Sequence, residues 1–160
     1  LFRSPDVILV GEMRDFETIN AAVTAAETGH LVFSTLHTTG AAETIDRIID
    51  VYPPHSQGQI RSQLANSVVG IISQTLVPTA DGKGRCAALE ILAATDAIRS
   101  MIREGKIFQI PTAIATGKKN GMFTLDQDLA RLVNMGKITN EVALTKCQDP
   151  NEYRRYLAVV

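Results

Sequence analysis

The chain has 160 residues, of which 45% are apolar and 21% charged, and its formal net charge is −1. This composition indicates a globular domain with a hydrophobic core and excludes a strong positive field for nucleic acid or anionic membranes. Aromatic residues, at 5%, are too few for a base-stacking surface, and no apolar run reaches the ~20 residues of a membrane-spanning helix. Two distant cysteines, Cys86 and Cys147, predict neither a disulfide framework nor a zinc ribbon. Because the chain starts at Leu1 rather than Met, we expect a piece of a longer protein.

The chain opens with a strand, a helix and a second strand. Residues 7–10 form a continuous apolar run, which is typical of a strand buried on both faces of a parallel sheet. Asp15 is a suitable N-cap for a helix over 16–27, and Gly29 is a suitable residue to end it. A second buried strand is predicted over 31–36. This order predicts a βαβ unit.

Apolar side chains at helical spacing then predict helices over 41–51 and 57–73, separated by two prolines. Residues 75–77 and 86–92 flank a glycine-containing turn at 81–84, which predicts a β-hairpin.

From Thr95 onward the pattern is helical. Thr95 is a predicted N-cap, and Thr124 with Gln127 fits a capping box. We therefore divide the chain into an α/β part, residues 1–92, and a helical part, residues 93–160. The helices predicted in the second part cover residues 96–104, 109–116, 125–135 and 140–146.

Glu12 follows the first predicted strand directly after Gly11. Ligands of open parallel sheets bind beyond the carboxyl ends of the strands. A carboxylate there can hold Mg²⁺ directly or through water, or polarise the attacking water in phosphoryl transfer. From these residues alone, a solvated loop carboxylate is an equal alternative.

His30 and His37 lie on either side of the second predicted strand. Seven positions on a strand place two side chains on opposite faces, which disfavours a metal ion shared with Glu12. His37 follows the carboxyl end of its strand, where an imidazole can donate a hydrogen bond to a γ-phosphate oxygen. The hydroxyls of Thr35 and Thr38 are further candidate donors. A single histidine near a strand end is also commonly structural.

Two longer segments resemble one family. Residues 5–15, PDVILVGEMRD, resemble the Walker B box of the type II secretion and type IV pilus ATPases, and residues 28–38, TGHLVFSTLHT, resemble their His box. The resemblance implies an α/β fold: part of a RecA-like P-loop ATPase core, a βαβ unit with an added β-hairpin, followed by a helical C-terminal subdomain. It implies ATP and Mg²⁺ as cofactors, with Glu12 acting on Mg²⁺ through water.

The resemblance also implies catalytic roles for His37 and His30 and nucleotide contacts for Thr35 and Thr38. An acidic box that is absent from these 160 residues supplies a second glutamate in the family. The identity of the general base therefore stays open.

Residues 97–104, AIRSMIRE, resemble the Ala-Ile-Arg-Asn-Leu-Ile-Arg-Glu motif of PilT-type pilus retraction ATPases, with departures at Ser100 and Met101. Arg99, Arg103 and Lys106 predict a basic stripe on one helix face, suited to an acidic partner surface. An ordinary amphipathic surface helix is the alternative. The residues assigned to this retraction or interface motif are Ala97, Ile98, Arg99, Met101, Ile102, Arg103 and Glu104.

The resemblance implies that the complete protein is a hexameric ATPase that drives type IV pilus retraction in twitching motility. It would act at the cytoplasmic face of the inner membrane on a platform protein, without nucleic acid and without a transmembrane segment. No G-x-x-x-x-G-K-[S/T] phosphate loop occurs in the 160 residues, so we expect this chain by itself to be inactive. A non-catalytic accessory ring subunit, a related secretion ATPase and a metal-dependent hydrolase are the alternatives.

Overall fold

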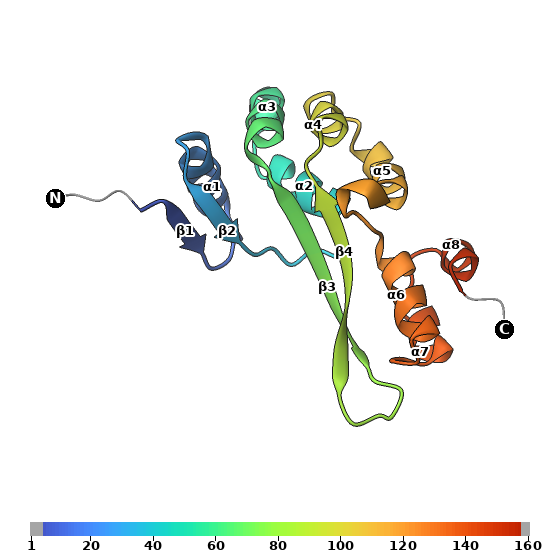
Figure 1. Cartoon of the computed structure of the whole chain (residues 1–160). Coiled ribbons are helices and arrows are strands. Elements are labelled where there is room, and N and C mark those ends of the chain that lie inside the picture. Colours follow the sequence, from blue (N-terminus) through green and yellow to red (C-terminus); the bar gives the residue numbers. More distant parts are fainter. Residues whose placement is uncertain (1–4, 158–160) are drawn as a thin grey trace. The chain divides into compact units, whose positions relative to one another are not determined.

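The computed structural model describes residues 5–157 and has an α/β fold, as predicted (Figure 1). Its contacts group the chain into two compact units, each built from separate stretches of sequence. One unit comprises Leu1–Val69 and Ala94–Ile110, and the other comprises Gly70–Ala93 and Pro111–Val160. The division into an α/β part and a helical part predicted after Leu92 stays a prediction.

The first unit begins with the predicted βαβ arrangement. Strands β1 (Val7–Val10) and β2 (Leu31–Ser34) are parallel, and Val10 lies opposite Ser34 at their carboxyl ends. Helix α1 (Phe16–Glu27) connects them and packs against β2 (Figure 1). Both strands therefore end level at one edge of the sheet.

The expectation that both strands are buried on two faces is wrong. Val7, Leu9, Leu31 and Phe33 share one face of the sheet and are 44–78% exposed. Helix α1 packs on β2, but no element within residues 5–157 buries the face that carries these four side chains. A parallel sheet is normally covered on both faces, whereas in the described residues this sheet exposes an apolar face.

The ends of α1 follow the prediction. The Asp15 carboxylate accepts a hydrogen bond from the Thr18 amide at 2.8 Å and caps the first turn. Gly29 follows the helix at φ +95°, a backbone conformation that L side chains rarely adopt. Both residues thus fix the length of the connection between β1 and β2.

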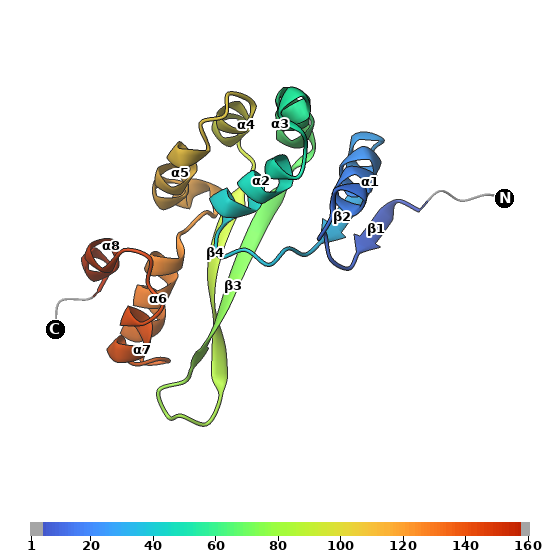
Figure 2. The ribbon, with the colours of Figure 1, turned by 180° about the vertical axis from the view of Figure 1, so that it is seen from behind.

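Helices α2 (Ala41–Asp50), α3 (Gln57–Ser67) and α4 (Asp96–Arg103) complete the first unit, with short 3₁₀ turns at Pro54–Ser56 and Ile107–Gln109. Helix α3 packs against α1, α2 and α4, and the loop from β2 to α2 is visible in Figure 2. Apolar side chains at helical spacing supply the buried contacts. The buried residues of these helices include Ile19, Val23, Ile45, Ile48, Ile49, Ile60, Leu64, Ile98 and Ile102.

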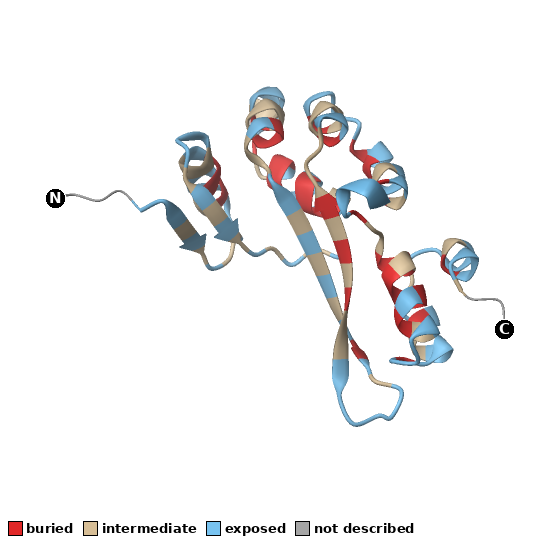
Figure 3. Ribbon diagram, viewed as in Figure 1, coloured by how far each residue is buried: buried red, intermediate tan, exposed pale blue. Residues whose placement is uncertain are grey.

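The second unit contains an antiparallel hairpin of β3 (Gly70–Pro78) and β4 (Arg85–Ala93). The predicted hairpin is confirmed, but the helix predicted over 57–73 ends at Ser67. Beyond that residue the branched side chains Val68, Val69, Ile71 and Ile72 favour a strand. They fit a helical stripe and a two-residue alternation equally well in so short a run. Figure 3 shows the alternation of exposed and less exposed residues along β3.

The helices of the second unit are α5 (Ile110–Thr116), α6 (Leu125–Asn134), α7 (Asn140–Leu144) and α8 (Pro150–Arg155). The first three confirm predicted helices, whereas α8 was not predicted from its short, mostly polar sequence. None of the helices in the described part of the chain is long and apolar enough to cross a membrane. The core of this unit consists of Val77, Ala88, Leu125, Leu129, Ala130, Leu132, Ile138, Ala143 and Tyr153.

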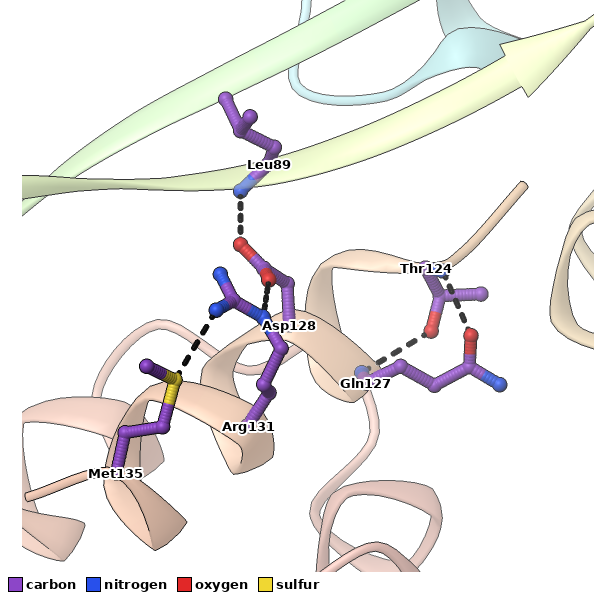
Figure 4. Close-up of polar contacts among 6 residues, drawn as sticks. All are labelled: Leu89, Thr124, Gln127, Asp128, Arg131 and Met135. Atoms are coloured by element: carbon purple, nitrogen blue, oxygen red, sulfur yellow. Dashed lines mark hydrogen bonds and ion pairs between the residues drawn. The ribbon is translucent and has the colours of Figure 1, made fainter. Parts of the chain in front are cut away.

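A buried carboxylate joins α6 to the outer edge of β4. Asp128 is buried, and its Oδ2 accepts a hydrogen bond from the Leu89 amide at 2.9 Å (Figure 4). Its Oδ1 accepts a 2.7 Å hydrogen bond from Nε of Arg131. The predicted capping box of Thr124 and Gln127 holds the start of the same helix. Asp128 thus supplies a hydrogen-bond acceptor for a backbone amide on the edge of β4 that is not paired with β3.

Replacing Asp128 with alanine is expected to lower the free energy of unfolding by about 1–3 kcal/mol, because the Leu89 amide loses its acceptor. Asp128→Asn retains an acceptor oxygen, so its loss is expected to be smaller. Glu152→Ala, which removes an exposed ion pair with Arg155, is the control and should change the free energy by less than about 0.5 kcal/mol. Urea unfolding of the purified chain measures all three. Equal unfolding midpoints for wild type and Asp128→Ala would contradict this account.

Candidate active site

Glu12 and His37 lie together at the carboxyl edge of the parallel sheet. Each follows its own strand by two or three residues, and the level ends of β1 and β2 bring the two loops side by side. Oε1 of Glu12 is 3.1 Å from Nε2 of His37. The sequence predicted this juxtaposition, and the structure places the two side chains within hydrogen-bonding distance.

Arg14 is a third member of this cluster, and the sequence interpretation missed it. Its Nε lies 2.5 Å from the same Oε1 of Glu12. The spacing of two residues in a non-helical loop was the available signal, because it places both side chains on one side of the chain. The hydrogen bond from Arg14 is the largest influence on Glu12 and lowers its pKa. Desolvation opposes this effect, and the electrostatic interactions with Arg14 and then His37 lower the pKa further, so the net shift is downward. Glu12 is therefore ionised at neutral pH.

An open groove of about 620 Å³ surrounds this cluster. This volume lies in the range of pockets that bind small molecules, which is about 300–1,000 Å³. The groove contains four carboxylates against two guanidinium groups, so a phosphate group would need a cation or further positive groups to bind there. Its lining residues are Glu12, Met13, Arg14, Leu36, His37, Thr38, Glu43, Asp46, Arg47 and Asp50.

Hydrogen bonds at the start of α2 hold the loop that carries His37. The Thr44 hydroxyl donates to the Gly40 carbonyl at 2.8 Å, so the Thr38 hydroxyl is the donor in its 2.7 Å contact with Thr44. The amide and the hydroxyl of Thr39 both donate to Oε2 of Glu43, at 3.0 and 2.5 Å, and these bonds lower the pKa of Glu43. Thr38 lines the groove, and its hydroxyl proton is used within the protein; the nucleotide contact expected of it stays a prediction.

Thr35, the other predicted nucleotide contact, is directed at the neighbouring loop. Its hydroxyl donates to the Gly11 carbonyl at 2.6 Å. Its own carbonyl accepts a hydrogen bond from the Met13 amide at 2.9 Å. Thr35 therefore connects the two loops that carry Glu12 and His37.

His30 lies at the opposite end of β2 from His37. Its Nδ1 is 3.1 Å from the Ala25 carbonyl, to which it donates, and 3.0 Å from the Thr28 hydroxyl. These contacts tie the start of β2 to the end of α1. The position of His30 gives no support to the catalytic role predicted for it.

Within residues 5–157, no group of three or more His, Cys, Asp or Glu side chains is arranged to hold a metal ion. Glu12 by itself fits Mg²⁺, because Mg²⁺ is commonly bound through one or two carboxylates together with water and substrate phosphates.

Helix α4 carries the predicted retraction motif, and its arginines have partners within the first unit. Arg99 donates from Nε to the Ala94 carbonyl at 3.1 Å, and from one terminal nitrogen to the carbonyls of Ala65 and Asn66 at 2.5 and 2.9 Å. Arg103 donates to the Asn66 side chain at 3.3 Å. Arg99 thus caps the last carbonyls of α3.

The remaining charges of the motif are also paired. Glu104 accepts a hydrogen bond from the Ser100 hydroxyl at 2.9 Å and forms a 2.6 Å ion pair with Lys106. Ile98 and Ile102 are fully buried. Arg99 is thus engaged by carbonyls of its own unit, whereas Arg103 and Lys106 stay exposed, and the basic stripe suited to an acidic partner stays a prediction.

Comparison with known proteins identifies the family of this chain. The family model described as "Type II/IV secretion system protein" matches residues 1–154. The chain belongs to the type II/IV secretion system protein family.

Within the type II/IV secretion system family, the chain is 56% identical over 149 residues to a twitching motility protein of Neisseria gonorrhoeae. It is 54% identical over 153 residues to the type IV pilus retraction ATPase PilT of Pseudomonas aeruginosa. These alignments cover 93% and 96% of this chain but 40% and 44% of the relatives. A solved structure of the pilus retraction motor PilT with bound ADP matches with a TM-score of 0.85 and 47% identity, covering 94% of this chain and 42% of that one.

In this type II/IV secretion system protein, Arg14→Gln is expected to raise the pKa of Glu12 toward its ordinary value. The substitution removes the nearby positive charge and leaves at most a neutral amide donor in place of the guanidinium group. Because the pKa of Glu12 is lowered by folding, the pair with Arg14 stabilises the fold above the ordinary carboxyl pKa and ceases to do so as the pH falls through the lowered value. A carboxyl ¹³C NMR titration measures the shift.

Arg47→Gln is the matched control for that titration, because Arg47 lines the same groove without being a cause of the Glu12 shift. It should leave the Glu12 titration unchanged. If Arg14→Gln also leaves it unchanged, the ion pair is not what lowers the pKa.

Proposed function

We propose that the complete protein is an ATPase that drives type IV pilus retraction. The observation that carries this proposal is the 3.1 Å contact between Glu12 and His37 at the carboxyl edge of the parallel sheet. Carboxylate and imidazole from two separate sequence boxes converge there, at the edge where sheets of this class bind their ligands. The names of the two pilus relatives supply the process, twitching motility with pilus retraction.

In this proposal Glu12 is the carboxylate that holds Mg²⁺ through water, and its lowered pKa keeps it ionised for that task. Bound with ATP, Mg²⁺ would neutralise part of the phosphate charge. His37 is placed to donate a hydrogen bond to a phosphate oxygen, since its Nε2 faces the groove beside Glu12. Arg14 is positioned to exchange its partner, from the Glu12 carboxylate to a phosphate oxygen, when a nucleotide enters.

The charge of the groove supports a site that is completed by other parts of the protein. Its four carboxylates outnumber its two guanidinium groups, and no phosphate-binding loop occurs in the 160 residues. We place that loop elsewhere in a complete protein more than twice as long, as in the relatives. The exposed apolar face of β1 and β2 is available for a layer contributed by the same additional sequence.

The assembly and its location belong to the same proposal. We propose a homohexameric ring at the cytoplasmic face of the inner membrane, acting on the pilus platform protein. In that ring α4 is a rigid element that transmits motion rather than a charged docking face. This assignment follows from the internal hydrogen bonds of Arg99 and the buried side chains Ile98 and Ile102.

Glu12→Gln in the full-length protein tests the proposal. It is expected to lower kcat for ATP hydrolysis about 10²- to 10⁴-fold, because the amide cannot carry the negative charge that the site uses. Cells with this variant as their only copy should keep surface pili and lose twitching, since extension continues without retraction. ATPase assays, pilus counts and twitching zones are the measurements.

Glu141→Gln, which changes an exposed carboxylate of α7, is the control and should behave as wild type. Full ATPase activity in Glu12→Gln would contradict the proposed chemistry. Loss of surface pili, instead of loss of retraction, would contradict the proposed direction of the motor.

A further inference from the structure

Thr35 contacts both peptide groups that flank the Cα atom of Glu12. The peptide before Glu12 presents the Gly11 carbonyl, which accepts the Thr35 hydroxyl at 2.6 Å. The peptide after Glu12 presents the Met13 amide, which donates to the Thr35 carbonyl at 2.9 Å. The orientation of these two peptide planes determines the φ and ψ angles of Glu12, and hence the direction in which its side chain leaves the backbone.

The same residue is close in sequence to the second member of the site. Thr35 directly follows β2 and precedes His37 by two residues. The regular strand pairing ends at Val10 and Ser34, before either loop carries its functional side chain. The two hydrogen bonds of Thr35 therefore extend the connection between the strands into the loops.

We infer that Thr35 is a positioning residue that fixes Glu12 relative to His37 and does not itself bind the nucleotide. The inference rests on the proposed ATPase function and replaces the nucleotide contact expected for Thr35 from the sequence. The hydroxyl proton is committed to the Gly11 carbonyl, so it is not available to a phosphate oxygen. Thr35 is also absent from the residues that line the groove.

The side-chain bond and the main-chain bond can be separated by substitution. Thr35→Val removes the hydroxyl and keeps the branched shape and the carbonyl that receives the Met13 amide. Gly11 is an exposed residue, so water is expected to replace the lost donor at its carbonyl and the fold to persist. Thr35→Ser keeps the hydroxyl, and Thr35→Cys supplies a weaker donor at the same place.

The experiment measures steady-state ATP hydrolysis and the Kd of a fluorescent ATP analogue with the full-length protein. Thr35→Val should lower kcat about 10- to 100-fold, because a misplaced Glu12 no longer meets the geometry that the reaction needs. KM and Kd should stay within about threefold of wild type. Thr35→Ser should restore kcat, and Thr35→Cys should give an intermediate value.

Thr24→Val is the matched control, because the Thr24 hydroxyl donates to the Asn20 carbonyl on the exposed face of α1. The kcat of this variant should equal that of wild type. A Thr35→Val protein with wild-type kcat, or with raised KM and Kd at unchanged kcat, would overturn the inference in favour of no role or of a direct nucleotide contact. If Thr35→Val does not fold, equal kcat values for Thr35→Cys and Thr35→Ser would overturn it. Wild-type protein without ATPase activity would instead refute the proposed function.

Discussion

The level pairing of β1 with β2 is the constraint on which the candidate site depends. Val10 lies opposite Ser34, so both strands deliver their following loops to the same edge of the sheet. A parallel ladder fixes this register through main-chain hydrogen bonds, without a contribution from the functional side chains. Glu12 and His37 then need only two or three loop residues to meet at 3.1 Å. The connection through α1, capped by Asp15 and ended at Gly29, has the length that this register requires.

The sequence was sufficient where one local rule acted alone. The cap of α1 at Asp15, the cap of α4 at Thr95 and the capping box at Thr124 depend on contacts within three residues, and all three were predicted and are present. The approach of Glu12 and His37 was also predictable, because the ends of neighbouring parallel strands meet at one edge. The family followed from the two boxes around these residues.

The sequence was insufficient where contacts between residues far apart in the chain decide the local structure. Arg99 was interpreted from its neighbours on α4, but two of its three acceptors are carbonyls of α3 more than thirty residues earlier. The boundary at Ser67 was missed because Ile71 and Ile72 fit two periodicities, and pairing with β4 selects the strand. The burial of β1 and β2 was overestimated. An apolar run indicates that a strand tends to be buried, but it does not identify the element that would bury it.

In the proposed site Glu12 and His37 act as one unit, and a double-mutant cycle on the full-length protein measures their coupling. The cycle combines Glu12→Gln and His37→Asn and measures kcat/KM for ATP hydrolysis in wild type, both single variants and the double variant. Residues that act together give strongly non-additive losses. The double variant is therefore expected to lose little more activity than the more impaired single variant. A double variant whose loss equals the product of the two single losses would contradict it.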